Sequence, residues 1–178
     1  MISEIIIRPA GSGDVQAITD IYAFHVKNGT ASFDTQPRTQ AESQEKIDIC
    51  QSRGWPFIVA VQNDEVLGYA YATQFRDRPA YASTCENSIY LRADRRGFGI
   101  GTQLLHRLLI EAEACGFRQM IAVAGGGEVA SVGLHIKLGF RETGRMHSVG
   151  RKFGKWLDTV YLQRALGAGD TVAPLIEP

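Results

Sequence analysis

The sequence has few cysteines, no excess charge of either sign and no long apolar run. Its three cysteines, Cys50, Cys85 and Cys115, are odd in number and widely spaced. This spacing argues against a disulfide framework and predicts a reducing compartment, the cytoplasm. Lysine plus arginine and aspartate plus glutamate number 19 each, so no overall field favours nucleic acid or an anionic membrane. A small-molecule partner fits this balance better.

Export and membrane signals are also missing. No stretch of about eighteen apolar residues occurs, and the amino terminus reaches the acidic Glu4 without a basic start and an apolar run. We therefore expect a protein that is neither exported nor membrane-spanning. The sequence shows no internal repeat and no low-complexity segment.

The length of 178 residues fits one domain, which can bury roughly two thirds of its unfolded surface. We expect this domain over residues 1–166. Small residues and two prolines then predict a mobile tail over residues 167–178.

Strand and helix patterns mix along the chain. β-branched apolar runs and turn residues predict six strands besides the one described below, and apolar stripes at helical spacing predict helices. The expected strands are 2–8, 57–61, 66–73, 119–124, 140–149 and 157–162, and the expected flanking helices are 15–28, 40–52 and 131–138.

The central stretch combines a strand from Cys85, a turn rich in arginine and glycine, and a helix with an apolar stripe. The turn contains Arg96 and three glycines, Gly97, Gly99 and Gly101. The first N–H groups of a helix lack intrahelical partners, and glycine lets an anion approach them. The turn therefore predicts a phosphate site, although such a turn can also be only a tight connection. It matches neither a dinucleotide fingerprint nor a Walker loop.

Several motifs resemble a known family. The sequence Arg96-Gly97-Phe98-Gly99-Ile100-Gly101 resembles the Arg/Gln-x-x-Gly-x-Gly/Ala motif of the GCN5-related N-acetyltransferases, and residues 130–140 resemble that family's later helix. Residues 79–81, 86–90 and 152–158 resemble its phosphinothricin and methionine sulfoximine acetyltransferase branch, and the resemblance spans residues 3–166. It implies an α/β, single-domain acyl-CoA N-acyltransferase fold with a mixed, mostly antiparallel central sheet flanked by helices. It also implies a homodimer.

The resemblance implies acetyl-CoA as the cosubstrate and a set of residues that bind it. These residues are Ile89, Tyr90, Leu91, Arg96, Gly97, Phe98, Gly99, Ile100, Gly101, Thr102, Glu128 and Ser131. One position departs from the branch: Glu128 stands where asparagine is usual, in an alignment uncertain by one residue. Either that contact with the pantetheine arm is lost or a backbone group replaces it.

Acetyl transfer to an amine needs a base, an oxyanion donor and a destination for the charge of the thiolate. The resemblance implies Glu86 as the base, a backbone N–H near Tyr90 or Leu91 for the oxyanion, and His135 as the acid. Because side chains alternate along a strand, Glu86 and Ser88 share one face, and Cys85, Asn87 and Ile89 share the other. Glu86 can also be read as a solvated strand-end carboxylate, and His135 as a helix histidine bonded locally for packing.

The acceptor site is predicted from Phe33 in a loop and from Arg76, Arg78 and Tyr81 before the catalytic strand. Two arginines can clamp a carboxylate or phosphinate, although paired arginines are more often solvated surface. This favours acetylation of the α-amine of a small amino acid or analogue, of the phosphinothricin or methionine sulfoximine type. The alternatives are another amine (a polyamine, an aminoglycoside or a protein amino terminus) or a non-catalytic acyl-CoA-binding module.

No metal site is predicted, because the remaining histidines lack ligand spacing to any partner. They are His25, His106 and His147.

Overall fold

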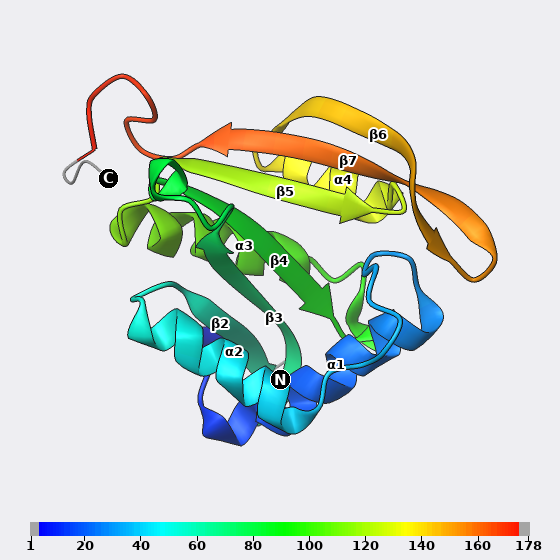
Figure 1. Cartoon of the computed structure of the whole chain (residues 1–178). Coiled ribbons are helices and arrows are strands. Elements are labelled where there is room, and N and C mark those ends of the chain that lie inside the picture. Colours follow the sequence, from blue (N-terminus) through cyan, green and yellow to red (C-terminus); the bar gives the residue numbers. More distant parts are fainter. Residues whose placement is uncertain (1–3, 175–178) are drawn as a thin grey trace.

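The computed structural model describes residues 4–174, which form one twisted sheet with helices on both faces (Figure 1). The strands are β1 (Ile6–Pro9), β2 (Phe57–Gln62), β3 (Glu65–Gln74), β4 (Thr84–Leu91), β5 (Gln119–Gly125), β6 (Arg141–Lys152) and β7 (Lys155–Ala165). The α-helices are α1 (Val15–Asn28), α2 (Gln40–Ser52), α3 (Ile100–Ala114) and α4 (Val129–Lys137). Short 3₁₀ helices cover Ser12–Asp14, Pro79–Tyr81 and Ala93–Arg95.

The sheet has the strand order β1-β2-β3-β4-β5-β7-β6. All neighbouring pairs are antiparallel except β4 and β5, which lie parallel because α3 crosses over between them. The predicted α/β fold with a mixed, mostly antiparallel sheet is therefore confirmed.

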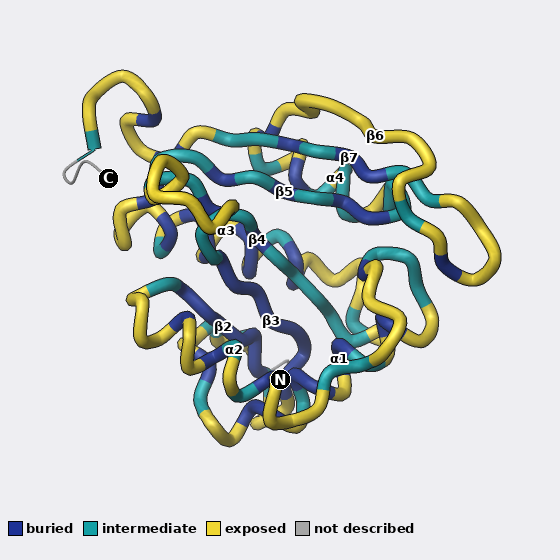
Figure 2. Tube along the Cα trace, in the orientation of Figure 1, coloured by how far each residue is buried: buried dark blue, intermediate teal, exposed yellow. Residues whose placement is uncertain are grey.

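The two faces of the sheet have separate cores (Figure 2). Alternate residues of β2 and β3 face opposite ways, so Val59 and Tyr69 pack with α1 and α2, whereas Ile58 and Ala70 pack with α3. The apolar stripe of α3, including Leu104 and Leu108, is fully buried. This stripe fixes the start of α3 against the end of β4.

The structure moves several predicted boundaries. β1 begins at Ile6 and includes Pro9, which the sequence predicts to end it; β1 is an edge strand, where a missing N–H is tolerated. β6 and β7 extend to Lys152 and Ala165, beyond the predicted ends, because they form one long hairpin. Residues 2 and 3 of the expected first strand lie outside the described residues.

In the carboxyl-terminal segment, residues 167–170 form a turn and residues 171–174 lie outside any helix or strand. The mobility expected for residues 167–178 is not tested by the structure and stays a prediction. Residues 175–178 lie outside the described part of the chain. Within residues 4–174, no helix has both the length and the apolar character needed to cross a bilayer.

Candidate active site

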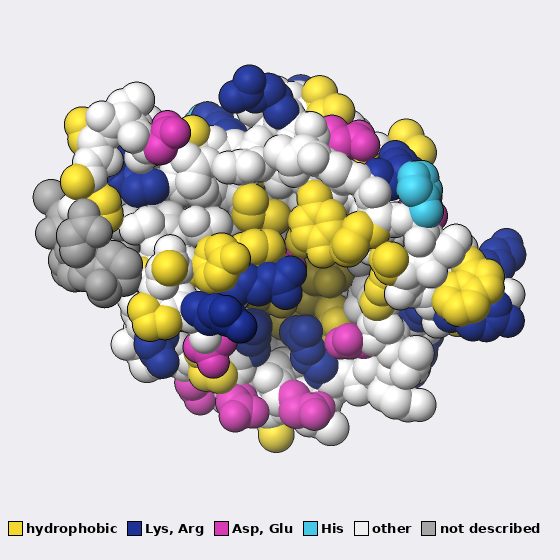
Figure 3. All heavy atoms as spheres, turned by 45° about the horizontal axis from the view of Figure 1, so that its top comes forward, with side chains coloured by type: hydrophobic (Ala, Val, Ile, Leu, Met, Phe, Trp, Pro, Cys, Tyr) yellow, Lys and Arg dark blue, Asp and Glu magenta, His cyan; other side chains and the backbone are white. Residues whose placement is uncertain are grey.

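The main cavity opens where β4 and β5 separate. Residues 84–87 of β4 pair with residues 119–122 of β5. Beyond these pairs the two strands diverge (Figure 1). A cavity of about 660 Å³ lies in the gap, lined by residues 88–91 of β4, residues 123–125 of β5 and the first turns of α3 and α4. Figure 3 shows a hollow with hydrophobic side chains inside it and lysine and arginine side chains beside it.

Unpaired main-chain groups of β4 face this cavity. Arg92 donates its N–H to the carbonyl of Leu67, and the carbonyl of Thr84 accepts from Phe75, so the main-chain groups of even-numbered β4 residues point toward β3. Those of Ile89 and Leu91 point the other way, toward the gap. The N–H groups of Ile89 and Leu91 are therefore available to a ligand, whereas that of Tyr90 is directed at β3.

The glycine turn after β4 forms the start of α3. Gly97 and Gly99 have φ of 83° and 79°, and Gly99 is the residue that caps α3. A Cβ built on either would have no atom within 4 Å, so the space over the turn is open. The N–H groups of the first turn of α3 lack intrahelical partners there. The turn therefore fits a phosphate group, as the sequence predicts.

Not every predicted cofactor-binding side chain of this turn reaches the cavity. Arg96, Gly97, Gly99, Gly101 and Thr102 line it. Phe98 is 70% exposed, and Ile100 is buried in the core under α3; neither side chain lines the cavity. Their main chain still belongs to the turn, so their cofactor role stays a prediction for the backbone only.

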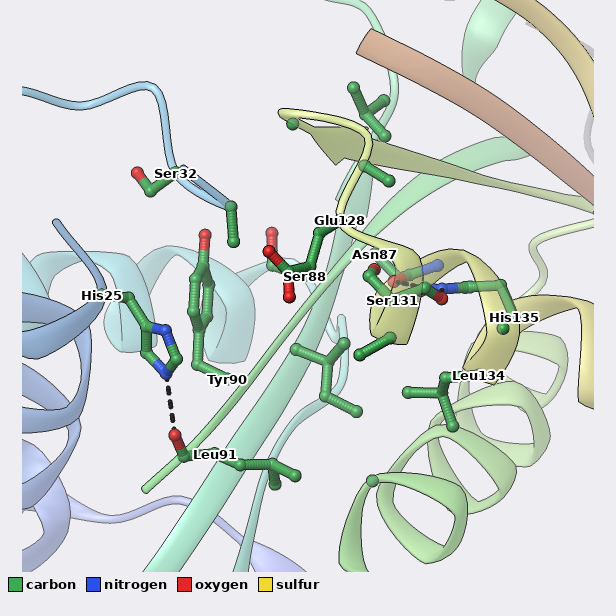
Figure 4. Close-up of a pocket in the computed structure, with 18 of the residues that line it drawn as sticks. His25, Ser32, Asn87, Ser88, Tyr90, Leu91, Glu128, Ser131, Leu134 and His135 are labelled. Carbon is green, nitrogen blue, oxygen red and sulfur yellow. Dashed lines mark hydrogen bonds between the residues drawn. The ribbon is translucent and has the colours of Figure 1, made fainter. Parts of the chain in front are cut away.

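His25 of α1 also lines the cavity, although no role is predicted for it from the sequence. Its Nε2 lies 2.7 Å from the carbonyl of Leu91 (Figure 4). Its Nδ1 lies 3.2 Å from a guanidinium nitrogen of Arg96. It follows Ile21 and Tyr22 by four and three residues, so it falls on the buried face of the helix. A histidine on the buried face of a helix needs polar partners, and this was the signal in the sequence that could have pointed to His25.

Glu86 of β4 lies in the cavity wall with Ser88. It is half-buried and has no hydrogen bond or ion pair with any residue in the described part of the chain. Burial raises the pKa of its carboxyl group above the ordinary value, and the charges of Arg76 and Lys46 offset part of this rise. A raised pKa makes a carboxylate a better proton acceptor near neutral pH.

His135 of α4 closes the end of the cavity near Asn87 (Figure 4). Its Nδ1 lies 2.7 Å from the carbonyl of Ser131, and its Nε2 lies 3.0 Å from the side-chain oxygen of Asn87. Burial lowers the pKa of the imidazole. Since both ring nitrogens have partners, this geometry favours the interpretation of His135 as a locally bonded, positioning residue over that of an acid.

Asn87, a polar residue on the buried face of β4, lines the cavity although no role is predicted for it from the sequence.

Phe33 forms another part of the wall and is wedged between two glycines. A Cβ on Gly150 of β6 would lie 2.2 Å from the Phe33 ring, and one on Gly125 of β5 would lie 3.0 Å from it. Next along the chain, a Cβ on Gly126 would lie 2.5 Å from Thr30. The glycine run at the end of β5 is therefore needed for close packing against residues 30–33.

A buried network holds this loop in place. Lys152 donates to the carbonyl of Ser32 over 2.7 Å, and the Ser32 hydroxyl lies 2.9 Å from that of Tyr22. Tyr22 in turn donates to Asp34 over 2.5 Å. Burial, with the bond to Asp34, raises the pKa of Tyr22 to about 12, so its hydroxyl stays protonated. The network joins α1, the loop and the β6–β7 hairpin around Phe33.

We predict that Gly150→Ala displaces Phe33 and raises KM for the acceptor amine, while KM for the acyl donor is unchanged. The added methyl group would occupy the position of the ring, which must move out of the wall. Steady-state kinetics with each substrate varied in turn measures the effect. Gly144→Ala on the same strand is the matched control, because a Cβ there meets nothing within 4 Å. Equal acceptor KM values for the two variants would contradict the prediction.

The other predicted acceptor residues lie outside the cavity wall. Arg76 is exposed and lies over the Phe75 ring at 4.7 Å, yet its charge reaches Glu86. Arg78 and Tyr81 are exposed on the same segment and do not line the cavity. Their substrate role stays a prediction.

Glu128 precedes α4 and points into the cavity (Figure 4). Its side chain makes no capping hydrogen bond to the helix, and Ser131, one turn later, also lines the cavity. Both residues therefore line the cavity, and their contact with the pantetheine arm stays a prediction.

The two buried histidines predict a loss of stability in mild acid. Burial lowers the pKa of His25 and of His135 below the ordinary value of 6.5. Below pH 6.5 the unfolded chain binds protons that the folded protein does not, so the free energy of unfolding falls as the pH decreases. Thermal melts between pH 8 and 5 measure this slope, which His135→Gln should flatten. His106→Gln, at an exposed position, should leave the slope unchanged; equal slopes in the two variants would refute the assignment.

The described residues offer no cluster of side chains that could together hold a metal ion. Among residues 4–174, no group of three or more histidine, cysteine, aspartate or glutamate side chains has a geometry that could hold a metal ion.

Comparison with known proteins is consistent with this site. The family model described as acetyltransferase (GNAT) family matches residues 19–140. The phosphinothricin N-acetyltransferase of Alcaligenes faecalis is 45% identical over 169 residues, covering 94% of this chain and 86% of that protein. The L-methionine sulfoximine/L-methionine sulfone acetyltransferase of Pseudomonas aeruginosa is 42% identical over 158 residues, covering 88% and 92%.

A solved structure is similarly close. The phosphinothricin acetyltransferase of Sinorhizobium meliloti, in complex with AcCoA, superposes with a TM-score of 0.94 at 43% identity, covering 96% of this chain and 92% of that one. The fold and the cleft are those of an N-acetyltransferase. The chain belongs to the acetyltransferase (GNAT) family, and the resemblance inferred from its sequence motifs is confirmed.

Proposed function

We propose that this acetyltransferase moves the acetyl group of acetyl-CoA to the α-amine of a small anionic amino acid analogue, of the phosphinothricin or methionine sulfoximine type. The observation that carries the proposal is the cleft between β4 and β5, which has a phosphate-binding turn at one end and Glu86 in its wall. The relatives named for these two substrates cover most of the chain.

The residues present fit acetyl-CoA. The open cradle over Gly97 and Gly99 and the first N–H groups of α3 accept the diphosphate, and Arg96 adds a positive charge. The outward N–H groups of Ile89 and Leu91 then pair with the extended pantetheine arm as a neighbouring strand would. Glu128 and Ser131 flank the arm from the start of α4.

Glu86 is the proposed base that takes a proton from the acceptor's ammonium group, directly or through water, so that the neutral amine can attack the thioester. Its raised pKa brings its basicity closer to that of the group it deprotonates. An N–H of Ile89 or Leu91 stabilises the negative charge that develops on the thioester oxygen. The contacts of His135 support a role in holding Asn87 at the end of the cleft.

Positive charge near Glu86 supports an anionic acceptor. Arg76 and Lys46 both act electrostatically on Glu86, and Arg76 belongs to the segment predicted to hold the acid group. Phe33 supplies an apolar part of the cavity wall to which Glu86 also belongs. A polyamine or aminoglycoside would place further cations near these two, which like-charge repulsion disfavours.

A thiol-release assay with acetyl-CoA tests the proposal. Phosphinothricin and methionine sulfoximine are expected to release coenzyme A at much higher kcat/KM than spermidine, an aminoglycoside or an amino-terminal peptide. Preference for any of these cationic or peptide acceptors would overturn the proposed substrate class. No release with any acceptor, despite binding of acetyl-CoA in calorimetry, would favour the non-catalytic alternative.

The active form is proposed to be a homodimer. β6 is an edge strand with nearly every residue exposed, and its hairpin with β7 displays Met146, Val149, Phe153 and Trp156. An exposed edge with apolar side chains is suited to a second copy of the chain. Light scattering at micromolar concentration should give twice the mass of one chain.

The cytoplasm is the proposed location. Cys50, Cys85 and Cys115 are all free thiols, which suits a reducing compartment.

A further inference from the structure

A buried histidine links Arg96 to the end of β4. His25 is 5% exposed, and its ring lies between the end of β4 and Arg96. The rings of Phe24 and Tyr90 pack on it at 5.8 and 5.4 Å, so its orientation is fixed. Figure 4 shows the ring beside Tyr90, with one nitrogen directed at Leu91.

The partners of the ring determine its tautomer. The carbonyl of Leu91 can only accept, so Nε2, at 2.7 Å, must carry a proton. The guanidinium of Arg96 can only donate, so Nδ1, at 3.2 Å, must be the unprotonated nitrogen. Burial and the charge of Arg96 both lower the pKa of His25, which keeps the ring neutral, although the bond to Leu91 and the charge of Glu128 act in the opposite direction.

Arg96 has no other hydrogen bond or ion pair among residues 4–174, and it is exposed. A long, exposed arginine side chain otherwise samples many rotamers, and ordering it on binding costs free energy. We propose that His25 is a positioning residue that holds Arg96 over the glycine turn and thereby prepares the site for the diphosphate of the donor. This inference rests on the proposed use of acetyl-CoA.

Two variants of His25 test its contact with Leu91 and its contact with Arg96 separately. In His25→Gln, the side-chain nitrogen can still donate to Leu91, but no acceptor faces Arg96. In His25→Asn, the shorter amide can place its oxygen near the position of Nδ1, and the bond to Leu91 is lost. We expect KM for acetyl-CoA to rise about 10-fold in His25→Gln, with little change in kcat, and to stay near the native value in His25→Asn.

A donor without the diphosphate provides the decisive control. With S-acetylpantetheine as donor, His25→Gln should change KM no more than the exposed-site control His106→Gln does. In an Arg96→Ala background, His25→Gln should add no further loss with acetyl-CoA, since the group that it positions is already gone. Equal losses with both donors, additive losses with Arg96→Ala, or no loss at all would overturn the proposal.

Nitrogen chemical shifts test the same bond without any variant of His25. In the native protein near pH 7.5, the proposal requires a neutral His25 with the proton on Nε2, and Arg96→Ala should shift the Nδ1 resonance. A proton on Nδ1, or an unchanged resonance, would refute it even if His25 variants fail to fold. Failure of the native protein to bind acetyl-CoA would instead refute the proposed function, and the resonances would still report on the Arg96 contact.

Discussion

Glu86→Gln is expected to lower kcat by about 10²- to 10⁴-fold, the range typical for loss of a general base. The amide keeps the size of the side chain but cannot take the proton that the acceptor's ammonium group must lose before its nitrogen can attack. The affinity for acetyl-CoA should be unchanged, because the glycine turn and Arg96 are untouched. Stopped-flow or steady-state thiol release gives kcat, and calorimetry gives the affinity.

The same substitution should preserve or increase thermal stability. Burial raises the pKa of Glu86, which means that the ionised form is disfavoured in the folded protein near neutral pH, and glutamine removes that charge. Glu113→Gln, at an exposed position on α3, makes the same chemical change far from the cavity wall and should alter neither quantity. Native turnover in Glu86→Gln would leave Glu86 as the solvated strand carboxylate that the sequence also allows.

Gly99→Ala should weaken binding of coenzyme A by about 10-fold or more. A left-handed backbone costs an alanine about 1–2 kcal/mol, so the turn relaxes from the conformation that presents its N–H groups. The new methyl group also enters the open space over the turn, where the diphosphate is proposed to lie. Isothermal titration calorimetry with coenzyme A measures the loss.

Gly54→Ala is the control that distinguishes the effect of backbone strain from the effect of lost ligand contact in Gly99→Ala. Gly54 has φ of 68° and also has nothing within 4 Å of a built Cβ, but it ends α2 and does not line the cavity. Both variants should lose similar thermal stability, and only Gly99→Ala should lose affinity. If Gly99→Ala binds coenzyme A as Gly54→Ala does, the glycine turn is not the diphosphate site.

Local signals made much of the architecture predictable. The stripe of Leu104 and Leu108 predicts α3, and the glycines before it predict the turn, because periodicity and φ preference act over a few residues. The face shared by Glu86 and Ser88 follows from strand alternation alone. The order of the strands has no such local signal and was not predicted; the family resemblance implied only that the sheet is mixed and mostly antiparallel.

The contacts of His25 were not predictable for a different reason. Its partners, Leu91 and Arg96, are 66 and 71 residues away, and no spacing rule links them. The same holds for Phe33 and Gly150, which meet only because the β6–β7 hairpin folds over the loop that follows α1. Conversely, Arg78 is predicted to bind the acceptor because an arginine can hold an acidic group, but in the structure it is exposed and does not line the cavity.

The short parallel pairing of β4 with β5 has a mechanical consequence. Within the sheet, four residues of each strand pair to join the β1–β4 half to the β5–β7 half; outside the sheet, the core under α3 also holds the two halves together. Past these pairs, the main-chain N–H groups of Ile89 and Leu91 have no partner strand, so a donor bound along β4 is expected to add hydrogen bonds across the gap. Because a ligand that binds only the folded protein stabilises it, saturation with donor is expected to raise the free energy of unfolding.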